Sequence, residues 1–241
     1  MSVSLGDAGV SPAEASQEAE TIEVAAMPRI VLFDFDGVLI RGDAFYLFMR
    51  ARFAASLGRK LLALLSLPWL VLLAPMPGLH AMRWLIRMAL LGVGQKRYQA
   101  AANEFAAVLA RRPRQFFRDG LSSLRMHQAQ GDRVIVVTGC EHTLVTGILR
   151  ELGLPELEVL ASSLHPGWFG MRLRWHNIGK RKVQSLSEHG VAAWQVAYGD
   201  SMYDAAMLKQ ADEAVLVNAT PALCKKMEKA LGRTVSRVEW M

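Results

Sequence analysis

The chain has 241 residues, of which 52% are hydrophobic, and it carries a formal net charge of +6. This length accommodates one domain with an insertion or two modest domains, with ample apolar residues for a core. The two cysteines, Cys140 and Cys224, exclude a disulfide framework or a cysteine-rich zinc site, as expected for a reducing compartment, and the six histidines lack metal-protease spacing.

The N-terminal segment is acidic and polar. Residues 1–26 contain five acidic and no basic residues, and they lack the positive start and apolar centre of a secretory signal. We therefore expect residues 1–28 to form a disordered acidic tail and the protein to remain in the cytoplasm.

A short run at residues 30–33, rich in β-branched and apolar side chains, predicts a buried strand that ends in Asp34 and Asp36. In open α/β sheets the ligand crevice lies beyond the carboxyl ends of the strands, so these two carboxylates are expected to be close enough to share a cation. A simple turn is the alternative interpretation of this tetrapeptide. An EF-hand loop is excluded because Val38 and Phe45 occupy positions that need acidic residues.

The stretch of residues 41–118 is strongly basic, with thirteen lysines and arginines against Asp43 and Glu104, which is a net charge of +11. The positive charge of the chain is therefore local. Within this stretch, residues 61–82 contain no charged side chain and reach about the length of a transmembrane helix.

Topology argues against a single membrane crossing, because it would place the strands before and after residues 61–82 on opposite sides of the bilayer. The segment is also interrupted by Pro68 and by prolines and glycine at 75–78. We expect helices lying in or dipping into the interface, with Trp69 and Trp84 near the headgroups and the basic clusters on anionic lipid. A soluble helical cap with packed apolar faces is the alternative. A nucleic-acid surface is disfavoured because the basic residues flank apolar segments rather than aromatic side chains on which bases could stack.

The second half of the chain alternates helices and strands, which predicts an α/β fold with a parallel sheet. Thr138 and Gly139 end a strand, where a hydroxyl and a backbone N–H can both donate to a phosphate oxygen. Cys140 is expected to be a small buried neighbour rather than a nucleophile. The predicted helices cover 121–129, 144–152, a helix opened by Lys180, and 223–231; the predicted strands cover 134–137, 159–162, 191–198 and 215–218, with a hairpin over 164–176.

Two further acidic residues follow a predicted strand end. Asp200 and Asp204 are four residues apart, so on a helix they would lie on one side, and together with Asp34 and Asp36 they predict an all-oxygen site suited to Mg²⁺. A capping Asp followed by a surface Asp is the alternative interpretation.

Four motifs in the right order resemble the haloacid dehalogenase-like (HAD) superfamily of aspartate-nucleophile phosphatases. They are Asp34-Phe-Asp36-Gly-Val-Leu, Val134-Ile-Val-Val-Thr138, Lys180 in Gly-Lys-Arg-Lys-Val, and Gly199-Asp200-Ser201-Met-Tyr-Asp204. The resemblance spans roughly residues 30–218. It implies a Rossmann-like core from residues 29–40 and 119–241, with a parallel sheet covered by helices on both faces, and an inserted all-helical cap over residues 41–118.

The resemblance also assigns roles. Asp34 is expected to be the nucleophile, Asp36 the general acid and base, Thr138 a ligand of the phosphate oxygens, and Lys180 the cation that neutralises Asp34, with Lys182 as a rival. Mg²⁺ is expected on the four aspartates, and substrate contacts on Asp43, Gly139 and Arg41. Forming an aspartyl-phosphate requires such cations, because a carboxylate and a phosphate repel each other.

The leucine-rich basic cap is similar to that of the phosphatidylglycerophosphatase C enzymes, which implies a membrane-lipid substrate and an anionic membrane surface as partner. The runner-up resemblance is to phosphoserine phosphatases, in which a Glu contacts the substrate at the position that Asp43 holds here, and this departure weakens that resemblance. A binding protein on a dead phosphatase fold is disfavoured because no motif residue is lost. The sequence leaves open whether water or an alcohol accepts the phosphoryl group.

Overall fold

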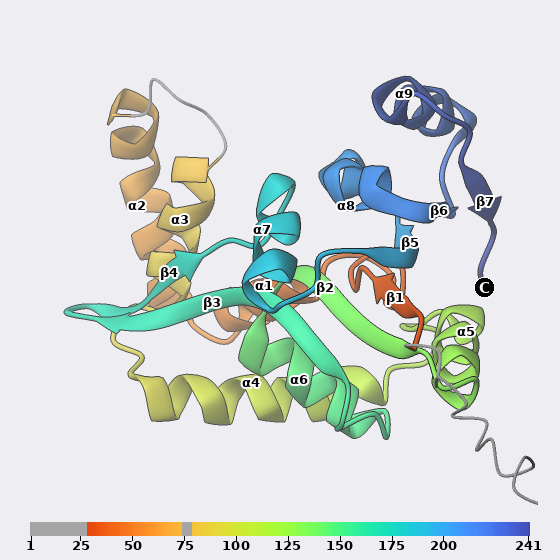
Figure 1. Cartoon of the computed structure of the whole chain (residues 1–241). Coiled ribbons are helices and arrows are strands. Elements are labelled where there is room, and N and C mark those ends of the chain that lie inside the picture. Colours follow the sequence, from red (N-terminus) through yellow and green to blue (C-terminus); the bar gives the residue numbers. More distant parts are fainter. Residues whose placement is uncertain (1–27, 74–78) are drawn as a thin grey trace, which may run out of the picture.

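The structure is a computed structural model, and it describes residues 28–73 and 79–241. The expected acidic tail and the prolines at 75 and 77 fall outside the described residues. The described chain forms an α/β fold around one seven-stranded sheet, in the order β4-β3-β2-β1-β5-β6-β7 (Figure 1). The strands are parallel except for β4, which pairs antiparallel with β3.

The strands are β1 (Ile30–Phe33), β2 (Arg133–Glu141), β3 (Glu158–Gly167), β4 (Gly170–Trp175), β5 (Trp194–Gly199), β6 (Ala211–Val217) and β7 (Ser236–Val238). The helices of the described residues are α1 (Ala44–Ala54), α2 (Leu57–Leu73), α3 (Leu79–Ala89), α4 (Gln95–Ala110), α5 (Arg118–Ala129), α6 (His142–Glu151), α7 (Lys180–Glu188), α8 (Ala205–Gln210) and α9 (Pro221–Leu231), with a 3₁₀ turn at Met202–Asp204.

The first strand lies at the centre of the sheet. Val31 of β1 pairs with Val134 of β2 on one side and with Val196 of β5 on the other. Successive side chains of a strand point to opposite faces, and both faces of β1 are buried: Val31 and Phe33 pack in one apolar cluster and Leu32 in the other. This explains why the run of residues 30–33 is apolar throughout rather than alternating.

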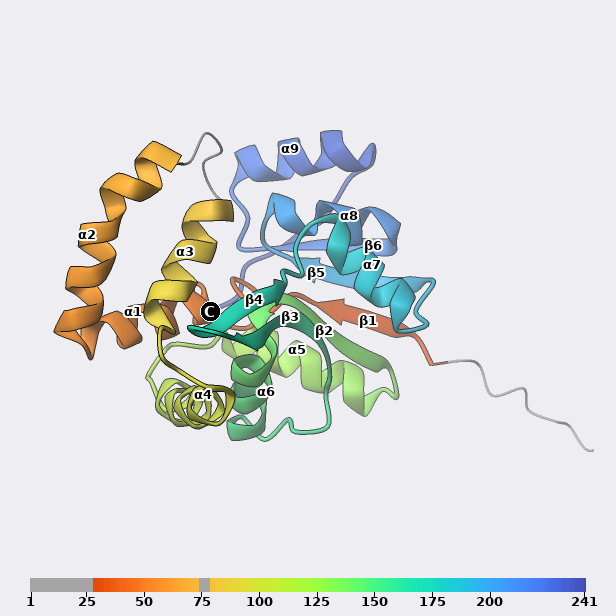
Figure 2. The same cartoon turned by 90° about the vertical axis from the view of Figure 1, so that its left-hand side faces the viewer.

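The two clusters correspond to the two faces of the sheet. One contains residues of α7, α8 and α9, such as Leu186, Met207 and Met227, while the other includes Leu124 of α5 and Ile148 of α6. Figures 1 and 2 show α7, α8 and α9 on one side of the sheet and α5 and α6 on the opposite side. The predicted helical cover on both faces is confirmed.

Helices α1 to α4 lie between β1 and β2 in sequence, which is the stretch for which a helical cap was expected. α4 packs against α6, and the Tyr98 hydroxyl of α4 donates a hydrogen bond to the buried Glu141 carboxylate at the end of β2. α3 packs against α2 and against β4. This segment therefore sits beside the carboxyl end of the sheet, next to β3 and β4 (Figure 2).

The expectation that Pro68 breaks its helix is wrong, because α2 runs from Leu57 to Leu73 through this proline. Proline removes one helical hydrogen bond, and the surrounding leucine-rich residues are strong helix formers. The indole N–H of Trp84 donates to Ser66 Oγ of α2 at 3.0 Å, and the expectation that Trp84 lies near lipid headgroups stays a prediction. Among the described helices none has both the length and the apolar character needed for a bilayer crossing.

The second half of the chain follows the predicted alternation closely. Each predicted helix and strand is present, with ends displaced by a few residues, and α7 begins at Lys180 as expected. The hairpin predicted around Pro166 and Gly170 is formed by β3 and β4. The short edge strand β7 was not predicted, because its sequence Ser-Arg-Val carries no apolar pattern.

Candidate active site

The candidate site lies at the carboxyl ends of β1, β2 and β5, where the connections from β1 change direction across the sheet. Such switch points open a crevice in α/β sheets. Asp34 follows β1 directly and is 7% exposed; its N–H donates to the Tyr198 carbonyl of β5, and its Oδ1 accepts from the Phe35 N–H. These contacts fix the carboxylate of Asp34 at the sheet edge.

A buried lysine faces this carboxylate. Lys182 Nζ lies 2.9 Å from Asp34 Oδ1 and 2.6 Å from Asp204 Oδ1, and Lys182 is 1% exposed. Burial alone would lower the pKa of Lys182, but the negative charges of Asp204 and Asp34 outweigh it and raise the pKa. The amine therefore stays protonated beside Asp34 at neutral pH.

The preference for Lys180 over Lys182 is corrected by this geometry. Both lysines lie in the first turn of α7, which starts after Gly179, but Lys180 is exposed and Lys182 is buried. Each helical residue advances the side-chain direction by about 100°, so two positions apart point to nearly opposite sides. The helix buries Lys182 against the site and turns Lys180 to solvent.

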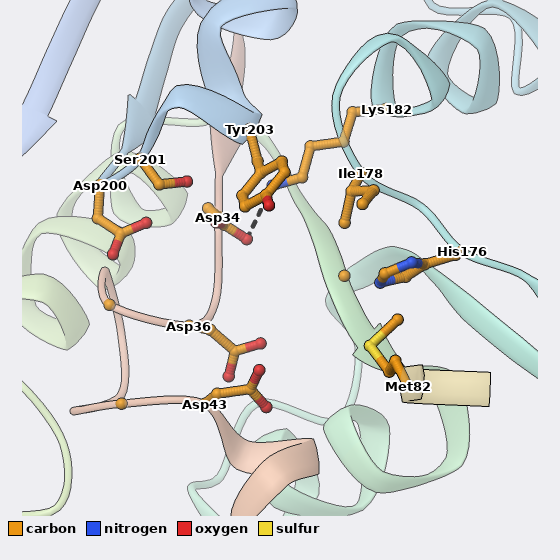
Figure 3. Close-up of a pocket in the computed structure, with 13 residues that line it drawn as sticks. Asp34, Asp36, Asp43, Met82, His176, Ile178, Lys182, Asp200, Ser201 and Tyr203 are labelled. Carbon is orange, nitrogen blue, oxygen red and sulfur yellow. Dashed lines mark ion pairs between the residues drawn. The ribbon is translucent and has the colours of Figure 1, made fainter. Parts of the chain in front are cut away.

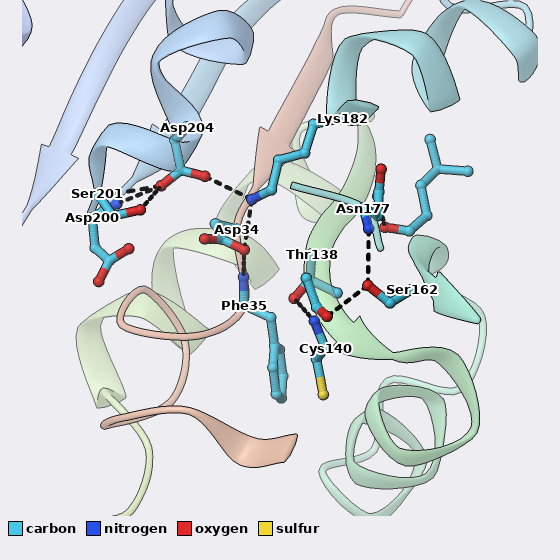
Figure 4. A network of polar contacts seen from close by, with 12 residues as sticks. Asp34, Phe35, Thr138, Cys140, Ser162, Asn177, Lys182, Asp200, Ser201 and Asp204 are labelled. Atoms are coloured by element: carbon cyan, nitrogen blue, oxygen red, sulfur yellow. Dashed lines mark hydrogen bonds and ion pairs between the residues drawn. The ribbon is translucent and has the colours of Figure 1, made fainter. Parts of the chain in front are cut away.

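Asp204 organises the loop after β5. Its Oδ2 accepts hydrogen bonds from the Asp200 N–H at 3.2 Å, the Ser201 N–H at 3.1 Å and the Ser201 hydroxyl at 3.1 Å, while its Oδ1 contacts Lys182 (Figure 4). Ser201 and Asp204 form a capping box around the 3₁₀ turn. Asp204 thus ties Lys182 to the segment that carries Asp200.

The carboxylates of Asp34, Asp200 and Asp204 form one acidic group, with an oxygen of each within 4.8 Å of the others. Burial, and next the charge of Asp204, raise the pKa of Asp34 above its usual range and that of Asp200 to about 6. Hard oxygen donors crowded in this way suit Mg²⁺, whose charge would relieve their repulsion. The residues present therefore fit the cation that the sequence predicts.

The side chain of Asp36 was expected in the same cation group, but it lies apart from it. Its Oδ1 accepts from the Ala44 N–H at 2.8 Å, at the first turn of α1. Burial, and next the charge of Asp43, raise the pKa of Asp36 to about 8. Asp43 itself caps α1, with Oδ1 accepting from the Tyr46 N–H. Asp36 is therefore a carboxyl that holds a proton near neutral pH.

The end of β2 supplies the third side of the site. Thr138 is fully buried and its Oγ1 accepts from the Cys140 N–H at 2.9 Å, while Gly139 faces the cavity. The Ser162 hydroxyl donates to the Gly139 carbonyl at 2.7 Å and accepts from the Asn177 N–H, which holds this turn in place (Figure 4). Cys140 is 1% exposed, which confirms the prediction of a buried, structural cysteine.

These groups surround a cavity of about 770 Å³. Figure 3 shows the carboxylates of Asp34, Asp36, Asp43 and Asp200 directed toward this space from one side, with His176 and Met82 opposite. Sequence reasoning missed several wall residues, because no motif marks them. The lining residues are Asp34, Asp36, Gly37, Gly42, Asp43, Met82, Gly139, His176, Ile178, Lys182, Asp200, Ser201 and Tyr203.

Arg41 was expected to contact substrate, but the structure turns it away from the residues that line the cavity. Its guanidinium lies 4.3 Å from the centroid of the Phe117 ring, and its backbone pairs with Gln115. Arg41 therefore contributes to packing between the ends of the α1–α4 segment.

Comparison with known proteins finds one matching family and several similar folds. The family model described as haloacid dehalogenase-like hydrolase matches residues 31–209. A protein of unknown function from Bordetella pertussis Tohama I superposes with a TM-score of 0.63 at 19% identity, covering 87% of this chain and 98% of that one. A HAD family hydrolase from Salmonella enterica subsp. enterica serovar Typhi gives a TM-score of 0.58 at 14% identity, covering 88% and 68%.

A phospho-aspartyl intermediate analogue of phosphoserine phosphatase gives a TM-score of 0.52 at 17% identity, covering 83% of this chain and 90% of that one. At these identities the likeness establishes a shared fold.

Proposed function

The chain belongs to the haloacid dehalogenase-like hydrolase family, and from this premise we propose that it is a phosphomonoester hydrolase that works through an aspartyl-phosphate on Asp34 and acts on a membrane phospholipid. The observation that carries the proposal is the contact between the Asp34 carboxylate and the buried ammonium of Lys182. A carboxylate attacks a phosphate only when positive charge offsets their repulsion, and Lys182 provides such charge beside the attacking group.

The first step transfers the phosphoryl group to the enzyme. An oxygen of Asp34 forms a bond to phosphorus while the bond from phosphorus to the leaving alcohol breaks, and Asp36 gives its proton to the leaving oxygen. The pKa of Asp36, raised to about 8 by burial and by Asp43, suits this role because the group still holds a proton at pH 7.

The second step releases phosphate. Asp36, now deprotonated, takes a proton from a water molecule as that water attacks phosphorus, and the bond between phosphorus and Asp34 breaks. Both side chains are then ready for another cycle. Asp36 acts as acid and then as base, which explains why one carboxyl next to the nucleophile is sufficient.

The end of β2, which neighbours β1 in the sheet, holds the phosphoryl oxygens in this proposal. The backbone N–H of Gly139, which lines the cavity, would donate to them, while Thr138, which is fully buried and is not among the lining residues, fixes this turn by accepting from the Cys140 N–H. Asp34 and Asp200, with Asp204 beside them, would hold Mg²⁺, which supplies positive charge against both the nucleophile and the phosphate.

The lipid substrate is supported by the α1–α4 segment. Residues 41–118 carry thirteen basic against two acidic residues, which favours an anionic headgroup, and Met82 of α3 forms part of the cavity wall. The exposed leucines of α2 support an association with a lipid surface rather than a cap packed wholly on itself. A substrate such as phosphatidylglycerophosphate combines the required phosphomonoester with an anionic lipid.

A small soluble phosphomonoester is the second candidate. Asp43 favours it, because this carboxylate lines the cavity and could pair with the ammonium group of a substrate such as O-phosphoserine. An anionic lipid headgroup gains nothing from Asp43, so this residue separates the two candidates.

The test is Mg²⁺-dependent release of inorganic phosphate from phosphatidylglycerophosphate in mixed micelles, beside O-phosphoserine, with Asp34→Asn as the blank. Lipid turnover that the Asp34 variant loses supports the proposal. Turnover of O-phosphoserine alone supports the second candidate, and turnover that persists in Asp34→Asn contradicts the nucleophile assignment. Measuring inorganic phosphate also separates hydrolysis from transfer to an alcohol.

A further inference from the structure

The tip of the β3–β4 hairpin exposes two adjacent aromatic rings. Trp168 is 95% exposed and Phe169 is 77% exposed, whereas large aromatic side chains are usually well buried. Neither residue lines the catalytic cavity. Two exposed rings at the end of a protruding hairpin indicate that this tip binds a partner outside the described chain.

This exposure is not the result of a loose loop. The Phe169 carbonyl accepts a hydrogen bond from the Gly92 N–H at 2.9 Å, and Gly170 forms an isolated β-bridge with Leu91. Gly170 has a φ of +126°, and a β-carbon there would overlap the Leu90 carbonyl oxygen, so only glycine permits this close approach. The hairpin tip is therefore anchored to the end of α3 while its rings face solvent.

A second apolar surface lies on α2, on the other side of α3. Leu57, Leu61, Leu64 and Leu65 follow the spacing of a single helix face, and each is at least half exposed. A helix normally turns such a face toward the core. Figure 2 shows α2, α3 and the hairpin unobscured on the side of the molecule that faces the viewer.

The charges around these apolar groups have one sign. Lys60 of α2 and Arg83 and Arg87 of α3 are exposed. The sequence contains no acidic residue between Asp43 and Glu104, nor between Glu158 and Glu188, so neither the helices nor the hairpin offers a negative charge.

A recess of about 310 Å³ separates α3 from the hairpin tip. Its walls include Trp84, Met88 and Trp168, together with the arginines Arg87 and Arg172. The Nε of Arg172 is buried and has no hydrogen-bond partner within the part of the chain that is described. An apolar recess with two guanidinium groups matches an acyl chain that carries a phosphate at its end.

We propose that α2, α3 and the β3–β4 hairpin form one docking face for an anionic phospholipid bilayer, with Trp168 and Phe169 entering the interface and Arg83, Arg87 and Arg172 meeting lipid phosphates. Trp and Phe side chains enter the boundary between headgroups and acyl chains, and basic residues are attracted to an anionic surface. A protein partner or a second copy of the chain would also bury the two rings, but it would need an acidic surface that matches the basic residues.

Docking in this way places the catalytic cavity next to the lipid, because Met82 of α3 lines that cavity two residues before Trp84. This inference rests on the proposed lipid substrate, because access to that substrate is the reason for the protein to bind a bilayer. The binding itself is independent of the chemistry of Asp34, so the two can fail separately.

The test is flotation of the full chain with vesicles of phosphatidylcholine that contain about one-third phosphatidylglycerol, and with pure phosphatidylcholine vesicles. Trp168→Ser combined with Phe169→Ser should weaken binding to the anionic vesicles about tenfold. Met126→Ser on α5, an apolar residue that is 49% exposed on another part of the molecule, should leave binding unchanged.

A charge-matched pair tests the basic residues. Arg83→Glu with Arg87→Glu should abolish the preference for anionic vesicles, while Lys225→Glu with Lys226→Glu on the exposed face of α9 changes the net charge equally and should retain it. Equal binding of the aromatic double variant and the wild type overturns the inference, as does equal binding to neutral and anionic vesicles.

Two further measurements separate this inference from the proposed function. All docking variants should hydrolyse a small soluble phosphomonoester at the wild-type rate. If they do, and vesicle binding is absent in the wild type, the docking face is refuted while the hydrolase stands. If the wild type binds vesicles but shows no Asp34-dependent phosphate release, the proposed function fails alone.

A wild-type dimer that the aromatic variant converts to monomer, without vesicle binding, identifies the face as a contact between copies.

Discussion

Gly37 and Asp200 adjoin each other so closely that a β-carbon on Gly37 would overlap the Asp200 carboxylate. Gly37 also has a φ of +77°, a left-handed conformation that other residues adopt at a cost. Gly37→Ala should therefore displace Asp200, weaken Mg²⁺-dependent activity at least about tenfold and lower stability by about 1–2 kcal/mol. The Mg²⁺ dependence of phosphate release and thermal unfolding measure the two effects.

Gly131→Ala is the matched control, because Gly131 has a φ of +81° but a β-carbon added to it would meet no atom within 4 Å. It should lose similar stability and keep its Mg²⁺ dependence. Unchanged Mg²⁺ dependence in Gly37→Ala would contradict the placement of Asp200 as a cation ligand.

Lys182→Ala should lower kcat/KM by about a hundredfold or more, because it removes the positive charge beside Asp34. It should also cost about 3–5 kcal/mol of stability at neutral pH, since two buried carboxylates lose their partner. Lys180→Ala in the same helical turn is exposed and should be close to wild type in both measurements. Equal losses in the two variants would refute the assignment of Lys182.

The pH dependence of kcat/KM should show a fall near pH 8, because Asp36 must hold a proton to act as an acid and its pKa is about 8. Asp43→Asn removes a negative charge that raises this pKa, while Asn still caps α1. The fall should then move to lower pH. The exposed Asp212→Asn should leave the profile in place. A profile that Asp43→Asn does not move would show that Asp36 does not set the basic limb.

Mg²⁺ should stabilise the fold more at high pH than at low pH. Asp36 and Asp200 have folded pKa values of about 8 and about 6, above the roughly 3.9 of an unfolded Asp. Each carboxyl therefore binds more protons in the folded state than in the unfolded state at any pH between its unfolded and its folded pKa. Without the metal, their contribution to the free energy of unfolding falls as pH rises from about 4 to about 8. Bound Mg²⁺ requires deprotonated ligands, so its increase in Tm should be larger at pH 8 than at pH 5.

Asp200→Asn is the comparison for this experiment and should lose most of the Mg²⁺ effect at pH 8. An equal Mg²⁺ effect in this variant and the wild type would place the cation elsewhere.

Tyr98→Phe should lower the free energy of unfolding by about 1–3 kcal/mol, because the buried Glu141 loses the hydroxyl that donates to it. Glu141 still accepts from the Leu144 N–H, so α6 keeps its cap. Tyr46→Phe at an exposed position of α1 should change stability by less than about 0.5 kcal/mol. Chemical denaturation measures both, and equal effects would show that this contact does not tie α4 to β2.

The sequence by itself determined the α/β class, the strand that ends in Asp34, and nearly every helix and strand after residue 118. These features are local: a β-branched run predicts a strand, and acidic residues at strand ends meet at one sheet edge whatever the details of packing. Asp34 and Asp200 could be brought together on this ground alone, and the family resemblance rested on the same residues.

Only the tertiary structure decided which of two lysines enters the site, because Lys180 and Lys182 share a helical turn and differ only in the direction that α7 presents to the sheet. It also decided that Asp36 contacts α1 and that Arg41 stacks on Phe117, since both depend on how α1 leaves the strand. His176 and Met82 reach the cavity from elements distant in sequence, and no local pattern encodes such meetings. Local propensity acts along the chain, whereas the choice among neighbouring side chains is made by the packing of whole elements.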